Sequence, residues 1–243
     1  MNENQTRKIF PVLGLALGLM GAGCRFLLYA LGTDEKGLLV AGHPASAAMW
    51  AVTVLGMAGA VAAAVTFRED TMAPDEAGKN VPAALGNAVM AVGIFSTLLL
   101  PEENGIAVLL GLHRLLAVLG AACLTAAAVY RFRGKTTPFG CYAGAAVFFL
   151  IHTLTRYQAW SGNPQMADYL HALGAGLCLA LFSYYETALT VGLGGRRQRL
   201  ALGTLGIFCC VTAAARGEYP VLHLCGAVWI FTVLFTARPK KEA

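Results

Sequence analysis

The chain has 243 residues, of which 57% are hydrophobic and only 13% are charged, and its formal net charge is +5. Soluble domains carry roughly 25% charged residues. The low charge and a mean hydropathy of +0.62 argue against a disordered chain, a nucleic-acid-binding protein, a secreted disulfide scaffold and an ordinary soluble enzyme. The composition instead predicts an all-α, polytopic helical membrane bundle.

Eight apolar stretches are long enough to be transmembrane helices, which need about 20 apolar residues. In chain order they are 9–31, 44–67, 81–100, 106–130, 138–157, 168–193, 200–216 and 221–236. The connections between them are short, so we expect residues 1–243 to form a single integral membrane domain. The last two stretches are short, and the sequence leaves open whether both cross the membrane or form a shallow re-entrant hairpin.

The basic residues predict the orientation of this bundle, because cytoplasmic loops of membrane proteins are enriched in Lys and Arg. With the N-terminus inside, the outer segments hold only Lys36, Arg156 and Arg216. We therefore expect a multi-pass protein of the plasma membrane with both termini in the cytoplasm. The inner segments hold thirteen basic residues: Arg7, Lys8, Arg68, Lys79, Arg131, Arg133, Lys135, Arg196, Arg197, Arg199, Arg238, Lys240 and Lys241.

A short internal repeat accompanies the spans. The pattern L-H-x-x-G-A occurs at 170–175 and again at 222–227, each time at the start of a predicted span. His113 has a comparable place in the fourth span, and His43 precedes the second. This spacing predicts four repeated helical hairpins.

Small residues and thiols indicate tight packing in the bundle. Glycines four residues apart let helix backbones approach closely, and two such pairs occur: Gly14 with Gly18, and Gly140 with Gly144. All seven cysteines fall in apolar segments without a CxxC spacing, so we expect them to act as small buried hydrophobic residues.

Histidines and arginines gather on the outer side of the predicted bundle. A charged side chain in the hydrocarbon costs roughly 2.5 kcal/mol or more, so such residues usually face the bundle interior. We expect an outward-facing vestibule that binds or transports a small polar solute. The alternative is that each side chain reaches the nearby interface or bonds a neighbouring carbonyl. The expected vestibule residues are Arg25, His113, Arg114, His152, Arg156, His171 and His223.

The outer side as a whole is not positive, so its charge alone does not select an anionic solute. Selectivity for anions would have to come from the depth of the arginines, while most acids lie in loops. The five basic residues are Arg25, Lys36, Arg114, Arg156 and Arg216, and the six acids are Asp34, Glu35, Glu102, Glu103, Asp168 and Glu218.

One carboxylate, that of Glu186, lies well inside a predicted span, within a polar stripe that also contains Ser183, Thr187 and Thr190. An ionisable group at this depth is a candidate functional residue, and one interpretation is that Glu186 is an acid that couples transport to a proton or cation. The alternative is a hydrogen bond to a neighbouring helix, made through Tyr184 or Tyr185.

The histidines also suit a metal-dependent membrane enzyme or a redox membrane subunit, which is the alternative function. Asp168 and His171, three residues apart, would share a helical face. However, the chain has no HExxH, HxxxH or CxxC spacing, and no Walker A, GxGxxG or GxSxG motif, so a non-enzymatic role is favoured and no cofactor is identified. A passive scaffold is a third interpretation. Besides the lipid bilayer, a protein partner or a second copy is left open, and no segment suits nucleic acid.

Overall fold

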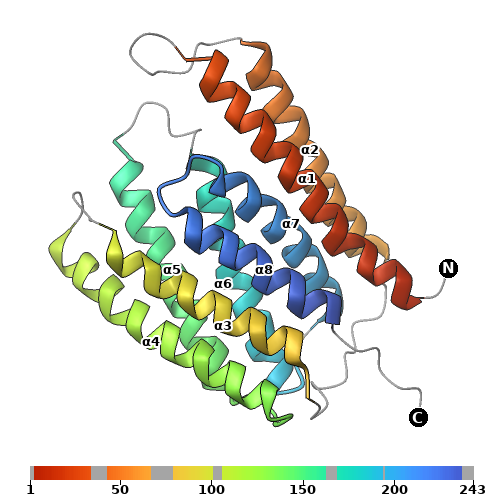
Figure 1. Cartoon of the computed structure of the whole chain (residues 1–243), viewed down its shortest axis with the longest axis vertical. Coiled ribbons are helices and arrows are strands. Elements are labelled where there is room, and N and C mark those ends of the chain that lie inside the picture. The colour runs from red at the N-terminus through yellow and green to blue at the C-terminus, as the bar shows by residue number, and fades with distance from the viewer. Residues whose placement is uncertain are drawn as a thin grey trace.

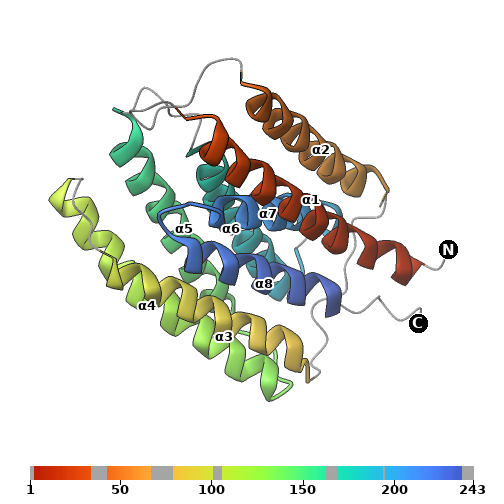
Figure 2. The same cartoon turned by 45° about the horizontal axis from the view of Figure 1, so that its top comes forward.

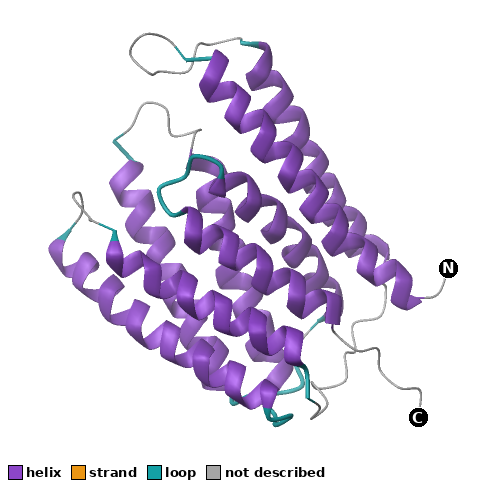
Figure 3. Ribbon diagram, viewed as in Figure 1, coloured by secondary structure: helices purple, strands orange, loops and turns teal. Residues whose placement is uncertain are grey.

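A computed structural model of the chain describes residues 3–33, 43–66, 79–100, 106–162, 169–193 and 195–236. These residues form α-helices and one short 3-10 helix, with no β-strand among them (Figure 3). The all-α prediction is confirmed. The elements are α1 (Glu3–Leu31), α2 (Pro44–Thr66), α3 (Val81–Ser96), η1 (Thr97–Leu99), α4 (Ala107–Phe132), α5 (Phe139–Trp160), α6 (Leu170–Thr190), α7 (Arg196–Ala214) and α8 (Pro220–Thr236).

Five of the described helices are long and apolar enough to cross a membrane: α1, α2, α3 with η1, α4 and α6. The chain is therefore compatible with a membrane protein. Helix α8 is apolar but has only 17 residues. Helices α5 and α7 are more polar, and α7 packs against α1, α2, α6 and α8. Because neighbouring helices surround α7, its side chains meet protein on most sides and need not be uniformly apolar.

Helices α3 to α8 form a closed ring, since each contacts the next and α8 returns to α3. Helices α1 and α2 form a hairpin outside the ring, packed mainly on α7 (Figures 1 and 2). Helix α1 begins and α8 ends at the same end of the bundle, which we call the terminal end (Figure 1). The opposite end is the distal end. Successive helices pair as hairpins, but the α1–α2 hairpin has a different environment from the three in the ring.

Four aromatic side chains fill the middle of the ring, and we call them the aromatic layer: Phe148, Phe149, Phe182 and Trp229. All four are fully buried. Phe149 and Phe182 lie 6.2 and 5.2 Å from Trp229 between ring centroids, and Phe148 lies 5.3 Å from Phe149. Such pairs each contribute about 0.5–1.5 kcal/mol beyond their buried area. The layer separates the polar side chains of the distal half from those of the terminal half.

The first predicted glycine pair makes the expected close contact between α1 and α7. A Cβ at Gly14 would lie 2.7 Å from the Thr204 carbonyl oxygen, and one at Gly18 would lie 2.8 Å from Val211 Cβ. Of the second pair, Gly144 packs on Cys123, whereas Gly140 faces open space and makes no such contact. The seven cysteines are free and are buried or partly buried, as the sequence predicts.

The helices extend beyond some predicted spans. Helix α1 begins at Glu3 and not at residue 9, and α7 begins at Arg196 and not at residue 200, because backbone hydrogen bonds carry a helix past the end of its apolar stretch. The sequence left open whether the last two apolar stretches form a re-entrant hairpin. They form two antiparallel helices, α7 and α8 (Figure 1). The residues of the sequence argument outside the described ranges are Asp34, Glu35, Lys36, Arg68, Glu102, Glu103, Asp168, Arg238, Lys240 and Lys241.

Replacing Gly14 by alanine should destabilise the fold, because its Cβ would meet the backbone of α7. Overpacking costs about 1–3 kcal/mol, which corresponds to a Tm lowered by roughly 3–10 °C. Thermal unfolding in mild detergent measures this change. The matched control is Gly23→Ala on the same helix, where no atom lies within 4 Å of the new Cβ. Equal Tm values for the two variants would contradict the close α1–α7 contact.

Candidate functional site

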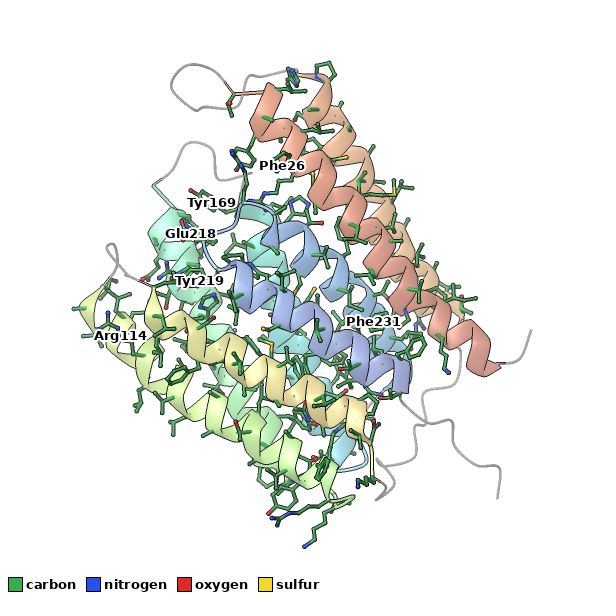
Figure 4. All side chains as sticks on the ribbon, in the orientation of Figure 1. Phe26, Arg114, Tyr169, Glu218, Tyr219 and Phe231 are labelled. Atoms are coloured by element: carbon green, nitrogen blue, oxygen red, sulfur yellow. The ribbon has the colours of Figure 1, made fainter. Side chains whose placement is uncertain are left out.

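The structure buries six of the seven predicted vestibule residues, each at most 8% exposed: Arg25, His113, His152, Arg156, His171 and His223. They come from α1, α4, α5, α6 and α8. The seventh, Arg114, is exposed at the distal end of α4 (Figure 4). The fifth histidine, His43, is partly buried before α2, where its Nδ1 accepts a hydrogen bond of 3.2 Å from the Ala45 N–H.

His113 of α4 and His152 of α5 form a hydrogen-bonded pair, with 3.0 Å between His113 Nε2 and His152 Nδ1. Phe148 stacks against both imidazoles, at 5.5 and 5.7 Å between ring centroids. The edge of Tyr219 meets His152 at 5.1 Å. Their bond needs one N–H and one lone pair, so both imidazoles cannot be doubly protonated while it persists.

Arg156 lies one turn beyond His152 and contacts the connection between α7 and α8. Its guanidinium lies 5.0 Å from the centre of the Tyr219 ring, and its Nη1 lies 3.6 Å from Glu218 Oε2. The Trp160 indole N–H donates to Glu218 Oε1 at 3.0 Å, and its ring stacks on Tyr169 at 4.2 Å. Of these residues, Tyr169, Glu218 and Tyr219 are seen at the distal end in Figure 4. The Glu218 side chain remains 46% exposed, so one face of this group reaches the surface.

A second group surrounds His171 at the start of α6. The Thr53 hydroxyl donates to the Met49 carbonyl at 2.8 Å, and His171 Nε2 lies 3.0 Å from the same oxygen. Because the only hydroxyl proton is already used, His171 Nε2–H must donate to Thr53. The positive charge of Arg25 of α1 acts on the imidazoles of both His171 and His223.

His223, in the first turn of α8, joins the two groups. It is 3% exposed and lies within electrostatic range of Arg25 and His152. Its Nδ1 is buried without a hydrogen-bond partner, and its Nε2 has none among the described residues. A buried polar group left unpaired costs about 1–3 kcal/mol. We call the whole set the distal cluster: Arg25, His113, His152, Arg156, His171, Tyr219 and His223.

Glu186 lies in the terminal half of the ring, where it binds two arginines. Arg131 of α4 donates from Nη2 to Glu186 Oε2 at 3.0 Å, and Arg199 of α7 donates from Nε to Glu186 Oε1. All three side chains are buried. Both arginines were expected in inner connections between spans, but they lie within α4 and α7. The sequence signal for a basic partner was Glu186 itself, since a buried carboxylate requires a cationic partner.

Further contacts connect these ions to the aromatic layer. The Arg131 guanidinium lies 5.6 Å from the Tyr142 ring centre, and Asn87 Nδ2 donates to the Tyr142 hydroxyl at 3.1 Å. The Trp229 indole N–H donates to Asn87 Oδ1 at 2.6 Å. Each ring helix supplies one member of this terminal network: Asn87, Arg131, Tyr142, Glu186, Arg199 and Trp229.

The other polar residues of the predicted stripe on α6 form hydrogen bonds within their own helix and are not members of the terminal network. The Ser183, Thr187 and Thr190 hydroxyls each donate to a carbonyl of their own helix, at 2.7–2.9 Å. Intrahelical bonds of this kind satisfy a hydroxyl inside a membrane without a partner helix. Glu186 is therefore the member of the stripe that links α6 to its neighbours.

For metal binding, the described residues contain no group of three or more His, Cys, Asp or Glu side chains that could hold an ion. Asp168, which the sequence pairs with His171, lies outside those residues. No protein-family model matches the chain, and searches of curated proteins and of solved structures find no match. The chemistry of the distal cluster and the terminal network must therefore carry the functional argument.

Removing the carboxylate of Glu186 should destabilise the protein more than removing one of its arginines. Glu186→Gln takes the shared counter-charge from two buried guanidinium groups, with an expected loss of about 3–5 kcal/mol. Arg199→Met leaves the Arg131–Glu186 pair together, so its loss should be smaller. Unfolding midpoints measure the order, with Arg133→Met at an exposed site as the unchanged control. A larger loss in Arg199→Met would contradict this account.

Proposed function

We propose that the protein binds a small polar solute in the distal cluster and transports it across a membrane. The observation that carries the proposal is His223, a buried imidazole without a hydrogen-bond partner among the described residues, which interacts electrostatically with Arg25 and His152. Polar residues that only hold helices together are expected to be paired. A bound solute would supply the missing partner.

The closed packing of the terminal half is consistent with a binding site that opens toward the distal end. The aromatic layer lies directly below the distal cluster, since Phe148 contacts His113 and His152. Below it, the terminal network ties all six ring helices together. Transport requires this closure to open, and Glu186 is the coupling acid in our proposal. A proton on Glu186 would weaken its hold on both arginines and loosen α4 and α7 from α6.

We further propose that all eight helices cross the plasma membrane, with the terminal end in the cytoplasm. The polar residues of α5 and α7 support this, because His152, Arg156 and Arg199 are buried within the protein. Helix α7 has 19 residues and is about 28 Å long, close to the hydrocarbon thickness. The predicted excess of inner basic residues gives the orientation.

Reporter fusions in a bacterial host test this topology. Alkaline phosphatase joined after Gly217 should be active, because the α7–α8 connection would lie outside, and joined after Lys135 it should be inactive. Green fluorescent protein at the C-terminus should fluoresce, as expected for a cytoplasmic terminus. An inactive Gly217 fusion alongside a fluorescent C-terminal fusion would mean that α7 and α8 do not both cross.

Osmotic reswelling of proteoliposomes tests transport without a known substrate. The probes are glycerol, urea and potassium formate, the last with valinomycin to balance charge. We expect at least one probe to enter faster than in protein-free liposomes, and Arg25→Ala and His152→Ala to slow it by about tenfold or more through lost charged hydrogen bonds. Arg114→Ala, at an exposed arginine, is the matched control and should behave as the native protein. Equal rates in Arg25→Ala, His152→Ala and native protein would exclude the cluster as the route.

A further inference from the structure

We infer that the connection between α7 and α8 is a gate over the distal cluster, and that Arg216 latches this gate to α1. The connection consists of residues 215–219 and lies at the distal end (Figure 1). The inference rests on the proposed function and adds the segment that admits a solute to the cluster. Three features of the connection support it: the histidines that it covers, the unequal contacts on its two sides and the strained backbone of Arg216.

The connection covers two histidines of the distal cluster. Gly217 lies against His223, since a Cβ on this glycine would be 3.7 Å from the imidazole Nδ1. The Tyr219 ring lies perpendicular to the His152 imidazole, with 5.1 Å between the ring centroids. Both histidines are at most 4% exposed. A solute that reaches His223 from the distal end therefore has to displace residues 215–219.

The side of the connection that faces α5 is held by several contacts. Tyr219 is buried, and the Arg156 guanidinium lies 5.0 Å from the centre of its ring. Glu218 accepts a hydrogen bond of 3.0 Å from the Trp160 indole N–H, and its second oxygen lies 3.6 Å from Arg156 Nη1. Because two neighbouring residues bind two buried side chains of α5, this side is the anchor of the connection.

The side that faces α1 is held more weakly. Close packing of α1 on α7 extends to Gly21, where a Cβ would overlap the Thr212 hydroxyl. Farther toward the distal end, the Arg216 guanidinium lies 5.8 Å from the Phe26 ring centre and 5.6 Å from the Tyr29 ring centre. We call these two contacts the latch. Arg216 and Phe26 are exposed, and cation–π contacts at exposed sites are weak. The latch can therefore break while the contacts to α5 persist.

The backbone of Arg216 is strained in the closed position. Its φ is 63°, and no other non-glycine residue in the described part of the chain has a positive φ. A side chain with a Cβ adopts this left-handed conformation at a cost in free energy, which glycine avoids. The next residue, Gly217, is small for another reason, since a Cβ there would overlap the Ala213 carbonyl oxygen. The strain is comparable in size to the gain from the latch, so the closed and open positions are nearly balanced.

Chemical labelling of the histidines in the full chain in mild detergent tests the gate. Diethyl pyrocarbonate is a small uncharged reagent that acylates accessible neutral imidazoles, and mass spectrometry gives the rate at each histidine relative to the partly exposed His43. His223 should be labelled slowly in the native protein and about tenfold faster in Arg216→Ala, the effect of losing two exposed cation–π contacts. The matched control is Arg114→Ala, at an exposed arginine of the same end, which should give the native rate.

Two further variants separate the latch from the strain. Arg216→Gly loses the same guanidinium but adopts the left-handed conformation without strain, so we expect His223 to be labelled more slowly than in Arg216→Ala. Phe26→Leu removes one of the two rings and should also speed the labelling of His223. Combined with Arg216→Ala it should add little, because both changes remove the same contact. Fully additive effects of the two changes would contradict the latch.

Equal labelling of His223 in Arg216→Ala and in native protein would overturn the gate. A rise shared equally by His113 and His171 would also overturn it, because it would show a general loosening of the bundle. Osmotic reswelling separates the gate from the proposed function. Faster labelling of His223 in Arg216→Ala, with no solute entry in any protein, would keep the gate and exclude transport. Solute entry in the native protein, with labelling unchanged in Arg216→Ala, would overturn the gate alone.

Discussion

The terminal half of this bundle depends on one buried carboxylate. An isolated ionised group in the interior costs several kcal/mol, so Glu186 fixes where α4 and α7 must bring Arg131 and Arg199 relative to α6. The contacts continue through Tyr142 and Asn87, and they end at Trp229. Helices with similar apolar surfaces thereby acquire a defined order and register, because each ring helix contributes one side chain to a single network.

The two halves of the ring differ in the hydrogen-bond and ion-pair partners of their buried polar side chains. In the terminal half the carboxylate of Glu186 and the amide of Asn87 find protein partners from other helices. In the distal half His113 is bonded to His152 and His171 to Thr53, whereas the His223 imidazole has no hydrogen-bond partner among the described residues. Ion pairs and hydrogen bonds between helices hold those helices in place, whereas unused hydrogen-bonding capacity at the buried His223 imidazole suits a bound ligand. This difference is why we propose binding in the distal half and closure in the terminal half.

Composition and stretch length were sufficient to predict the helices. The cost of burying charge led to the expectation of a vestibule of seven residues, six of which the structure buries. Arg114 was predictable too: adjacent helical residues point about 100° apart, so His113 and Arg114 cannot both face the ring. Asn87, an amide in an apolar helix, was a second available signal. The closed ring, and the pairing of Glu186 with Arg131 and Arg199, were not predictable, because contacts between apolar helices rich in small residues leave no distinctive pattern in one sequence.

The enclosure of α7 bears on how the chain is assembled. A ribosome makes α1 and α2 first, yet their main contacts with the ring are to α7, with α1 also touching α8. The hairpin made first therefore has its docking surface made almost last, and until then it lacks its main partner helix. Helix α7 in turn begins with a basic turn and needs neighbours on several sides. Docking of the first hairpin thus has to follow the synthesis of α7, whereas the ring helices can pair in the order in which they are made.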